Sequence, residues 1–211
     1  VSCITKSSQI RGNFLENSDL ARLKEQDAPI CLLNVNGAKD NAVSNYIQFG
    51  EEKNLHKRYL TKARTPWYKL ERRNPAPLLF GVFSREKFKV IRNLTTALNL
   101  TCYHGFYPNL FGQGIIDHLF LYFQSRAARQ ILSLSMRKYG DGLEKFEPND
   151  LNSALVPNIE WFNQLDPSWV RTEIQFCKEH GCISEELENR FDVLLNTAPK
   201  APFLDFQTAA I

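Results

Sequence analysis

Apolar residues recur at every third or fourth position over residues 116–134, and this stripe constrains the fold more than any other feature. Such spacing places them on one face of a helix. It predicts one long helix that ends near Gly140. A helix of this kind must bury its apolar face against another layer. The stripe consists of Ile116, Phe120, Phe123, Ala127, Ile131 and Leu134.

Strand-like segments precede the stripe. "PLLFGVF" and "KFKVIRN" are joined by "SREK" and predict a hairpin. In the second segment Lys87 and Lys89 alternate with Phe88 and Val90, so we expect one packed face and one basic face. "LNLTCYHGFY" predicts a third strand, and "PICLLNV" at residues 29–35 predicts a buried strand.

Helical patterns cover residues 18–26, 43–53, 167–180 and 184–196. Together with the strands they predict an α+β fold, in which a mixed or antiparallel sheet carries a long helix and a helical C-terminal part. We expect one domain over residues 1–160 and a helical extension over residues 161–211 that packs on it.

The net charge of +3 is unevenly distributed. Residues 57–92 hold eleven Lys or Arg against Glu71 and Glu86, a local net charge of +9. Residues 139–211 hold thirteen acidic against five basic residues. A basic segment on a nearly neutral protein indicates an anionic partner.

The densest part of this segment is "KRYLTKARTPWYKLERRNPAP" at residues 57–77. Pro66, Pro75 and Pro77 exclude a long continuous helix here. Lys and Arg neutralise phosphates, and aromatic rings stack on bases, so the composition suits nucleic-acid binding. Trp67 either stacks on or wedges beside a base, or lies in the core and braces the loop.

Motifs of common enzyme sites are missing from the sequence: it has no Gly-rich phosphate loop, no G-x-S-x-G and no H-E-x-x-H. "CKEHGC" at residues 177–182 reads as a helix end with Gly181 as its C-cap rather than as a metal site. Cys102 and His104 alternate on a predicted strand, where we interpret the thiol as a core residue. We therefore predict no metal, cofactor or catalytic residue in this chain.

The five cysteines are odd in number and scattered, which favours a reducing cytoplasm over a disulfide framework. No apolar run approaches the roughly 20 residues of a membrane span, so we expect no membrane association. The chain begins with Val1 and shows no signal peptide. We expect it to be a domain of a longer protein.

Several motifs follow one another in a familiar order: "RYLT" (58–61), "PWY" (66–68), "ER…PAP" (71–77) and "RN" (92–93). "LTCYHGFYPN" (100–109) and the connector at 140–158 come next. Together, residues 1–160 resemble the C-terminal target-recognition (specificity) region of bacterial N6-adenine DNA methyltransferases. These enzymes belong to type II restriction–modification systems, in the TaqI-like group.

The resemblance implies a parent enzyme with two domains. Its catalytic domain would bind S-adenosylmethionine and hold a flipped adenine with an Asn/Asp-Pro-Pro-Tyr/Phe motif. That motif does not occur in this sequence, so the resemblance covers the recognition half only. This half would choose the target sequence and hold double-stranded DNA against the catalytic domain, without methyl transfer of its own.

The resemblance also implies a set of DNA-contacting residues. Arg64 is the candidate base reader, because Arg forks onto guanine edges. Trp67 and Tyr68 either shape the loop or touch DNA. Two other hypotheses stay open: a protein-interaction module that docks an acidic partner, and a stand-alone enzyme that uses Cys102 and His104. The expected phosphate contacts are Lys57, Arg58, Lys62, Lys69, Arg72 and Arg73, flanked by Lys89 and Arg92.

Overall fold

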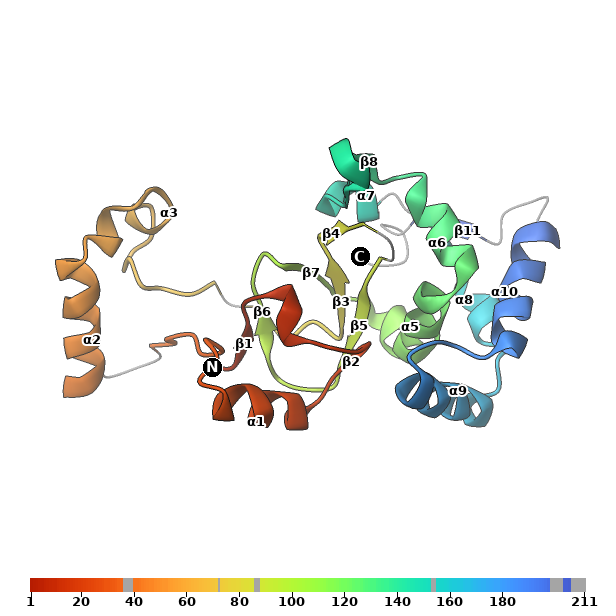
Figure 1. Ribbon diagram of the computed structural model, residues 1–211, viewed down its shortest axis with the longest axis horizontal. Coiled ribbons are helices and arrows are strands. Elements are labelled where there is room, and N and C mark those ends of the chain that lie inside the picture. The colour runs from red at the N-terminus through yellow and green to blue at the C-terminus, as the bar shows by residue number, and fades with distance from the viewer. Residues whose placement is uncertain (36–39, 72, 86–87, 153–154, 198–202, 206–211) are drawn as a thin grey trace.

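A four-stranded sheet in the order β2-β5-β3-β7 lies at the centre of the molecule (Figure 1). β3 pairs antiparallel with both β5 and β7, whereas β2 runs parallel to β5. The computed structural model describes all residues except 36–39, 72, 86–87, 153–154, 198–202 and 206–211. The strands of this sheet are β2 (Phe14–Leu15), β3 (Leu78–Gly81), β5 (Val90–Asn93) and β7 (Tyr103–Phe106).

The sheet is buried on both faces. Leu78 and Phe80 of β3 enter one buried cluster, while Leu79 of β3 and Ile91 of β5 enter another. This division follows from the alternation of side chains along a strand. The first face is covered by α5 (Ile116–Gln124), α6 (Arg126–Ser133), α8 (Ile159–Phe162), α9 (Pro167–His180) and α10 (Glu185–Thr197). The second is covered by N-terminal elements that include β1 (Cys3–Ile4) and α1 (Asn17–Glu25). The short helix η1 (Ser7–Gln9) lies between these two in the chain.

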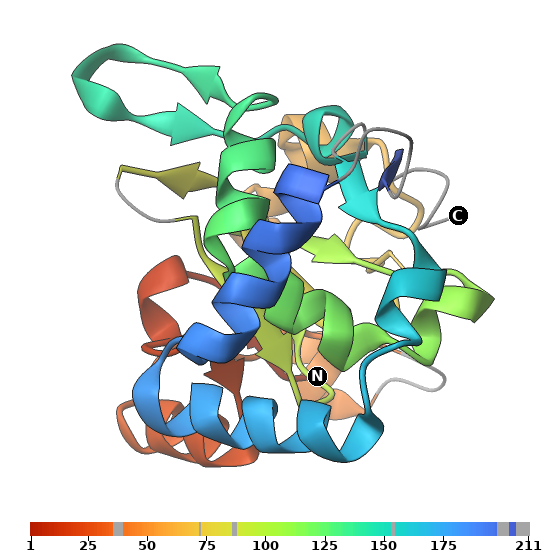
Figure 2. The same cartoon turned by 90° about the vertical axis from the view of Figure 1, so that its right-hand side faces the viewer.

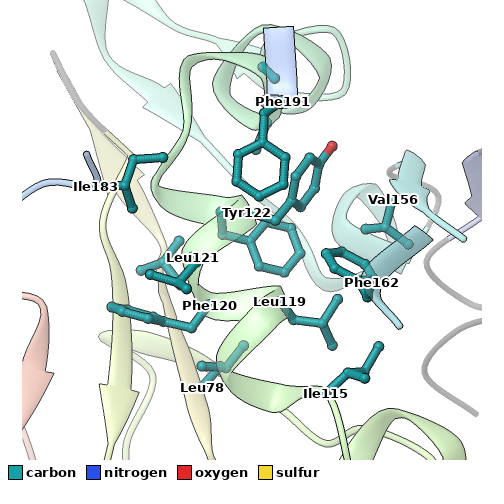
Figure 3. Packing of buried hydrophobic residues seen from close by; sticks show 14 of the residues in the cluster. Leu78, Ile115, Leu119, Phe120, Leu121, Tyr122, Val156, Phe162, Ile183 and Phe191 are labelled. Carbon is teal, nitrogen blue, oxygen red and sulfur yellow. The ribbon is translucent and has the colours of Figure 1, made fainter. Parts of the chain in front are cut away.

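Aromatic rings from several helices meet in the first cluster (Figure 3). The Tyr122 ring of α5 meets Phe162 of α8 and Phe191 of α10 at centroid distances of 6.1 and 5.4 Å. Both contacts are edge-to-face, the arrangement that aromatic pairs prefer. The C-terminal helices therefore share one core with the sheet, and the division at residue 160 stays a prediction.

The single long helix expected over residues 116–134 is wrong: the structure has two helices, α5 and α6, separated at Ser125. The backbone of Ser125 is extended, with ψ of 159°. Its Oγ accepts a hydrogen bond from the Ala128 backbone at 3.1 Å and donates one to the Tyr122 carbonyl at 2.6 Å. A serine that bonds local backbone groups competes with helix continuation. The chain then turns into β8 before Gly140, and Leu134 is exposed.

Short elements complete the described fold. The buried strand predicted at residues 29–35 is also wrong, because only a single bridge between Ser2 and Cys31 forms there. Figure 2 shows β8 and β9 as a projecting hairpin. The short elements of the described fold are β4 (Phe83–Ser84), β6 (Leu98–Asn99), α4 (Leu110–Gln113), β8 (Arg137–Lys138), η3 (Gly140–Gly142), β9 (Glu144–Lys145), α7 (Pro148–Asn152), β10 (Leu155–Pro157) and β11 (Phe203–Asp205).

The predicted α+β class is confirmed, as are the antiparallel hairpin of β3 and β5 and the helices α9 and α10. The third predicted strand forms as two pieces. Its second piece, β7, pairs with β3, and its first, β6, pairs in parallel with β1. No helix within the described residues is long and apolar enough to cross a membrane.

Candidate nucleic-acid interface

Residues 40–71 project from the body of the molecule, and we call this segment the arm (Figure 1). It contains α2 (Asn41–Glu52), η2 (Leu55–Lys57) and α3 (Tyr59–Lys62). Asp40 caps α2 by accepting a hydrogen bond from the backbone of Val43 at 2.7 Å. The helix expected over residues 43–53 is confirmed, and prolines end helical structure beyond α3 as expected.

Trp67 lies inside the arm. A Cβ placed on Gly50 of α2 would stand 2.6 Å from the Cη2 atom of Trp67, so the indole rests directly on bare helix backbone. The indole Nε1 donates to the Glu51 carboxylate at 3.1 Å, and the ring meets Tyr68 edge-on at 5.7 Å. This packing supports a bracing role for Trp67 rather than stacking on a base.

The tip of the arm is held by side-chain to backbone hydrogen bonds. The Thr61 hydroxyl contacts the carbonyl oxygens of Leu55 and Arg58, the second at 3.1 Å. Beyond α3, the Arg64 Nη1 donates to the Lys69 carbonyl at 3.3 Å and closes the loop that carries Trp67. The Thr61 hydroxyl therefore ties the short helix α3 to η2.

Positive charge concentrates on the outside of the arm. Residues 53–70 hold six Lys or Arg and no Asp or Glu. Four of the expected phosphate contacts are exposed there, and none of the four forms a salt bridge with another residue in the described part of the chain. Their charges are available to an anionic ligand. These residues are Lys57, Arg58, Lys62 and Lys69.

Arg64 and Arg73 lie at the root of the arm on either side of Glu71. The Glu71 carboxylate is 3.7 Å from the Arg64 guanidinium and also pairs with Arg73. Both arginines line a cavity of about 550 Å³ between the arm and the segment that includes His104 and Tyr107. Arg72 lies outside the described residues.

A second cavity adjoins the first. It has a volume of about 930 Å³ and is lined by Tyr68 and Lys69 of the arm, together with Asn34 and Thr96 of the body. Arg64 and Arg73 therefore line the first cavity and Lys69 lines the second, whereas Lys57, Arg58 and Lys62 are exposed on the arm and line neither.

Lys89 and Arg92 are not part of this region, because both side chains are engaged inside the body. Lys89 donates to the Ile10 carbonyl, and burial lowers the pKa of its amine. The Arg92 Nε donates to Asp117 at 2.7 Å, and its Nη1 to the Pro77 carbonyl at 3.2 Å. The basic face expected on the segment at residues 87–93 is therefore bonded within the body at Lys89, and Lys87 lies outside the described residues.

Cys102 and His104 do not bond to each other in the hydrogen bonds seen among the described residues. The Cys102 thiol donates to the Ile4 carbonyl at 3.8 Å, whereas the His104 Nε2 is 3.0 Å from the Phe146 carbonyl oxygen. Burial raises the pKa of the Cys102 thiol, which is the opposite of what a reactive thiolate needs.

The other cysteine-containing segment is a helix end, as expected. Gly181 caps α9 in the left-handed conformation, with φ of 72°. Across the part of the chain that the structure describes, no three His, Cys, Asp or Glu side chains are grouped as metal ligands.

Two exposed residues of α3 escaped the sequence reasoning. Tyr59 and Leu60 are 82% and 69% exposed, directly between the cations of the arm. The sequence does carry a signal for their exposure: both residues are flanked by Lys and Arg and lie outside any apolar stripe.

Comparison with known proteins gives a consistent result. Residues 1–188 match the family described as "Type II methyltransferase M.Eco57I, C-terminal domain". The chain is 41% identical over 201 residues to the Type II methyltransferase M.AccI of Acinetobacter calcoaceticus, covering 92% of this chain and 37% of that protein. It is 24% identical over 160 residues to the Type II methyltransferase M.XamI of Xanthomonas campestris pv. amaranthicola, covering 74% of this chain and 29% of that protein. No solved structure matches the chain significantly.

Proposed function

The chain belongs to the family of C-terminal domains typified by type II methyltransferase M.Eco57I, and from this premise we propose that it is the DNA target-recognition domain of an adenine-specific modification methyltransferase. In this proposal the parent enzyme works in the cytoplasm of a bacterium as part of a restriction–modification system. Its remaining part binds S-adenosylmethionine and transfers the methyl group, while this chain holds the duplex.

A division of labour of this kind suits the chemistry. A base inside the double helix is out of reach of a methyl donor, so it must leave the stack and enter a pocket. The duplex must be held in register while the base is outside. A domain that carries exposed positive charge fits this holding role.

The observation that carries the proposal is the set of four exposed cations on the arm. Each Lys or Arg that neutralises a phosphate releases condensed counterions, which makes binding favourable and dependent on salt. Arg64 and Arg73 at the root of the arm are the candidates for contacts to base edges, because the guanidinium fork matches guanine. Glu71 holds both guanidinium groups beside the cavity.

The test is a salt titration of duplex binding, followed by fluorescence anisotropy. A variant with Gln at Lys57, Arg58, Lys62 and Lys69 removes the four charges from the arm. Each phosphate contact contributes roughly 0.9 to the magnitude of the slope of log affinity against log salt. If all four residues contact phosphates, the magnitude of the slope therefore falls by about 3.6 in this variant. The matched control places Gln at four exposed cations of the body: Lys6, Arg11, Lys24 and Arg171.

Both variants change the net charge equally. A difference between their duplex affinities therefore reports the position of the removed charges and not the total charge. The proposal expects the arm variant to lose affinity and slope, and the body variant to keep most of both. Equal losses in the two variants would mean that the arm is not the contact surface. A salt-sensitive dimer without duplex affinity, seen by light scattering, would favour the protein-interaction module.

A further inference from the structure

Tyr59 and Leu60 form an exposed apolar tip on the arm. Tyr59 is 82% and Leu60 69% exposed, although they stand at consecutive positions of a short helix. Large apolar side chains at this exposure on a projecting element are costly in water and mark contact sites when they cluster.

The tip is positioned rather than loose. Thr61, the next residue, is bonded through its hydroxyl to the carbonyl oxygens of Leu55 and Arg58. The Lys62 ammonium group stands 6.0 Å from the centre of the Tyr59 ring. The two apolar side chains are therefore presented from a fixed support and have a cation beside them.

Charge on both sides identifies the kind of partner. Lys57 and Arg58 precede the tip and Lys62 follows it, and no acidic residue occurs over residues 53–70. A second copy of the arm would bring like charges together, which is unfavourable. Duplex DNA offers two rows of phosphates with an apolar base stack between them, which matches an apolar tip between cations.

We infer that Tyr59 and Leu60 are a wedge that inserts at one base step of the bound duplex and partly unstacks it. The inference rests on the proposed function. Apolar side chains inserted in this way separate neighbouring base pairs and kink the helix. The cations around the tip would hold the phosphates on either side of the opened step. Loosened stacking next to the target would make extrusion of the adenine easier.

The test uses a duplex that contains the site methylated by the parent enzyme, with 2-aminopurine at each adenine in turn. The emission of 2-aminopurine rises when its base leaves the stack, so it reports unstacking separately from binding. We expect a rise at one step with the wild-type protein. With Tyr59→Ala and Leu60→Ala combined, the rise disappears and affinity falls about tenfold, the scale of one lost base contact.

The salt dependence of binding separates the wedge from the charges. The double variant keeps every Lys and Arg, so its salt slope should equal that of the wild type. The matched control is Tyr46→Ala on α2, an aromatic residue of the same arm that is 62% exposed. It should leave both affinity and emission unchanged. Because all three side chains are exposed, none of the variants should unfold the protein, and thermal denaturation checks this.

The outcomes distinguish the two proposals. Duplex binding with the same emission rise in the double variant as in the wild type would refute the wedge and leave the recognition role standing. An equal loss of emission in Tyr46→Ala would also refute it, because the effect would belong to the whole arm. No duplex binding by the wild-type protein would refute the recognition role and the wedge together.

Discussion

The Asn93 side chain connects the segment that returns from the arm to the loop that follows β5. Replacing Asn93 with Ala should destabilise the protein substantially. Its Nδ2 donates to the carbonyl oxygens of Ala76 and Ala97 at 3.0 and 3.1 Å. Its Oδ1 accepts from the backbone and hydroxyl of Thr95 at 3.0 and 2.8 Å. The side chain thus ties residue 76, just before β3, to the loop after β5.

The expected loss follows from burial. Ala76 and Ala97 are 0% and 1% exposed, so in Asn93→Ala no water easily replaces the amide at their carbonyls. A buried acceptor left unpaired costs about 1–3 kcal/mol. Thr95 is only half-buried, so water recovers most of its bonds. Two carbonyls therefore give a loss of about 3 kcal/mol, a large share of the roughly 5–15 kcal/mol that stabilises a typical domain.

Urea denaturation followed by circular dichroism measures this loss, with Asn99→Ala as the control. Asn99 also donates to two carbonyl oxygens, of Leu100 at 3.3 Å and Tyr103 at 2.8 Å, but from a half-buried position. Solvent should limit its loss to about 1 kcal/mol. Equal losses in the two variants, or a loss below about 1 kcal/mol for Asn93→Ala, would refute the reasoning from burial.

Three further predictions concern the arm and the thiols. Glu71→Gln frees two guanidinium groups and should tighten duplex binding several-fold in anisotropy measurements, with little change in melting temperature because its ion pairs are exposed. Gly50→Ala favours the helix by about 1 kcal/mol but forces the Trp67 indole off its support, so tryptophan emission should shift to longer wavelength. Burial raises the pKa of Cys3 and of Cys177 to about 11, so at pH 8 both should react with a thiol reagent only on unfolding, after the exposed cysteines.

The helices that could be predicted are those whose ends carry their own signals. α9 begins after Asp166, which accepts hydrogen bonds from the backbone of Ser168 and Trp169, and it ends at Gly181. These residues act locally, so the sequence reveals them. The break at Ser125 was missed, since the apolar stripe continues across it and a serine within such a stripe also fits a helix interior with its side chain turned to solvent.

The location of the basic residues depended on tertiary structure. Lys89 and Arg92 belong to the same charged stretch of sequence as the arm. Yet β5 pairs with β3, and Lys89, just before β5, and Arg92, within it, bond to partners in the body. Alternation within a strand predicts two faces but not whether a neighbour covers each one. The aromatic content of the arm had a similar ambiguity, because a bracing Trp67 and an exposed Tyr59 look alike in sequence.

We propose that the arm uses Trp67 as a brace and Tyr59 as a contact to the duplex, and this division has a physical reason. A flexible basic loop would lose conformational freedom on binding DNA, which weakens affinity. Packing Trp67 on Gly50 and bonding Thr61 to η2 fix the arm before any ligand arrives. If the arm acts as a fixed support, loss of Trp67 should weaken duplex binding although every Lys and Arg is kept. A lower duplex affinity in such a variant would come from lost support of the arm and not from lost charge.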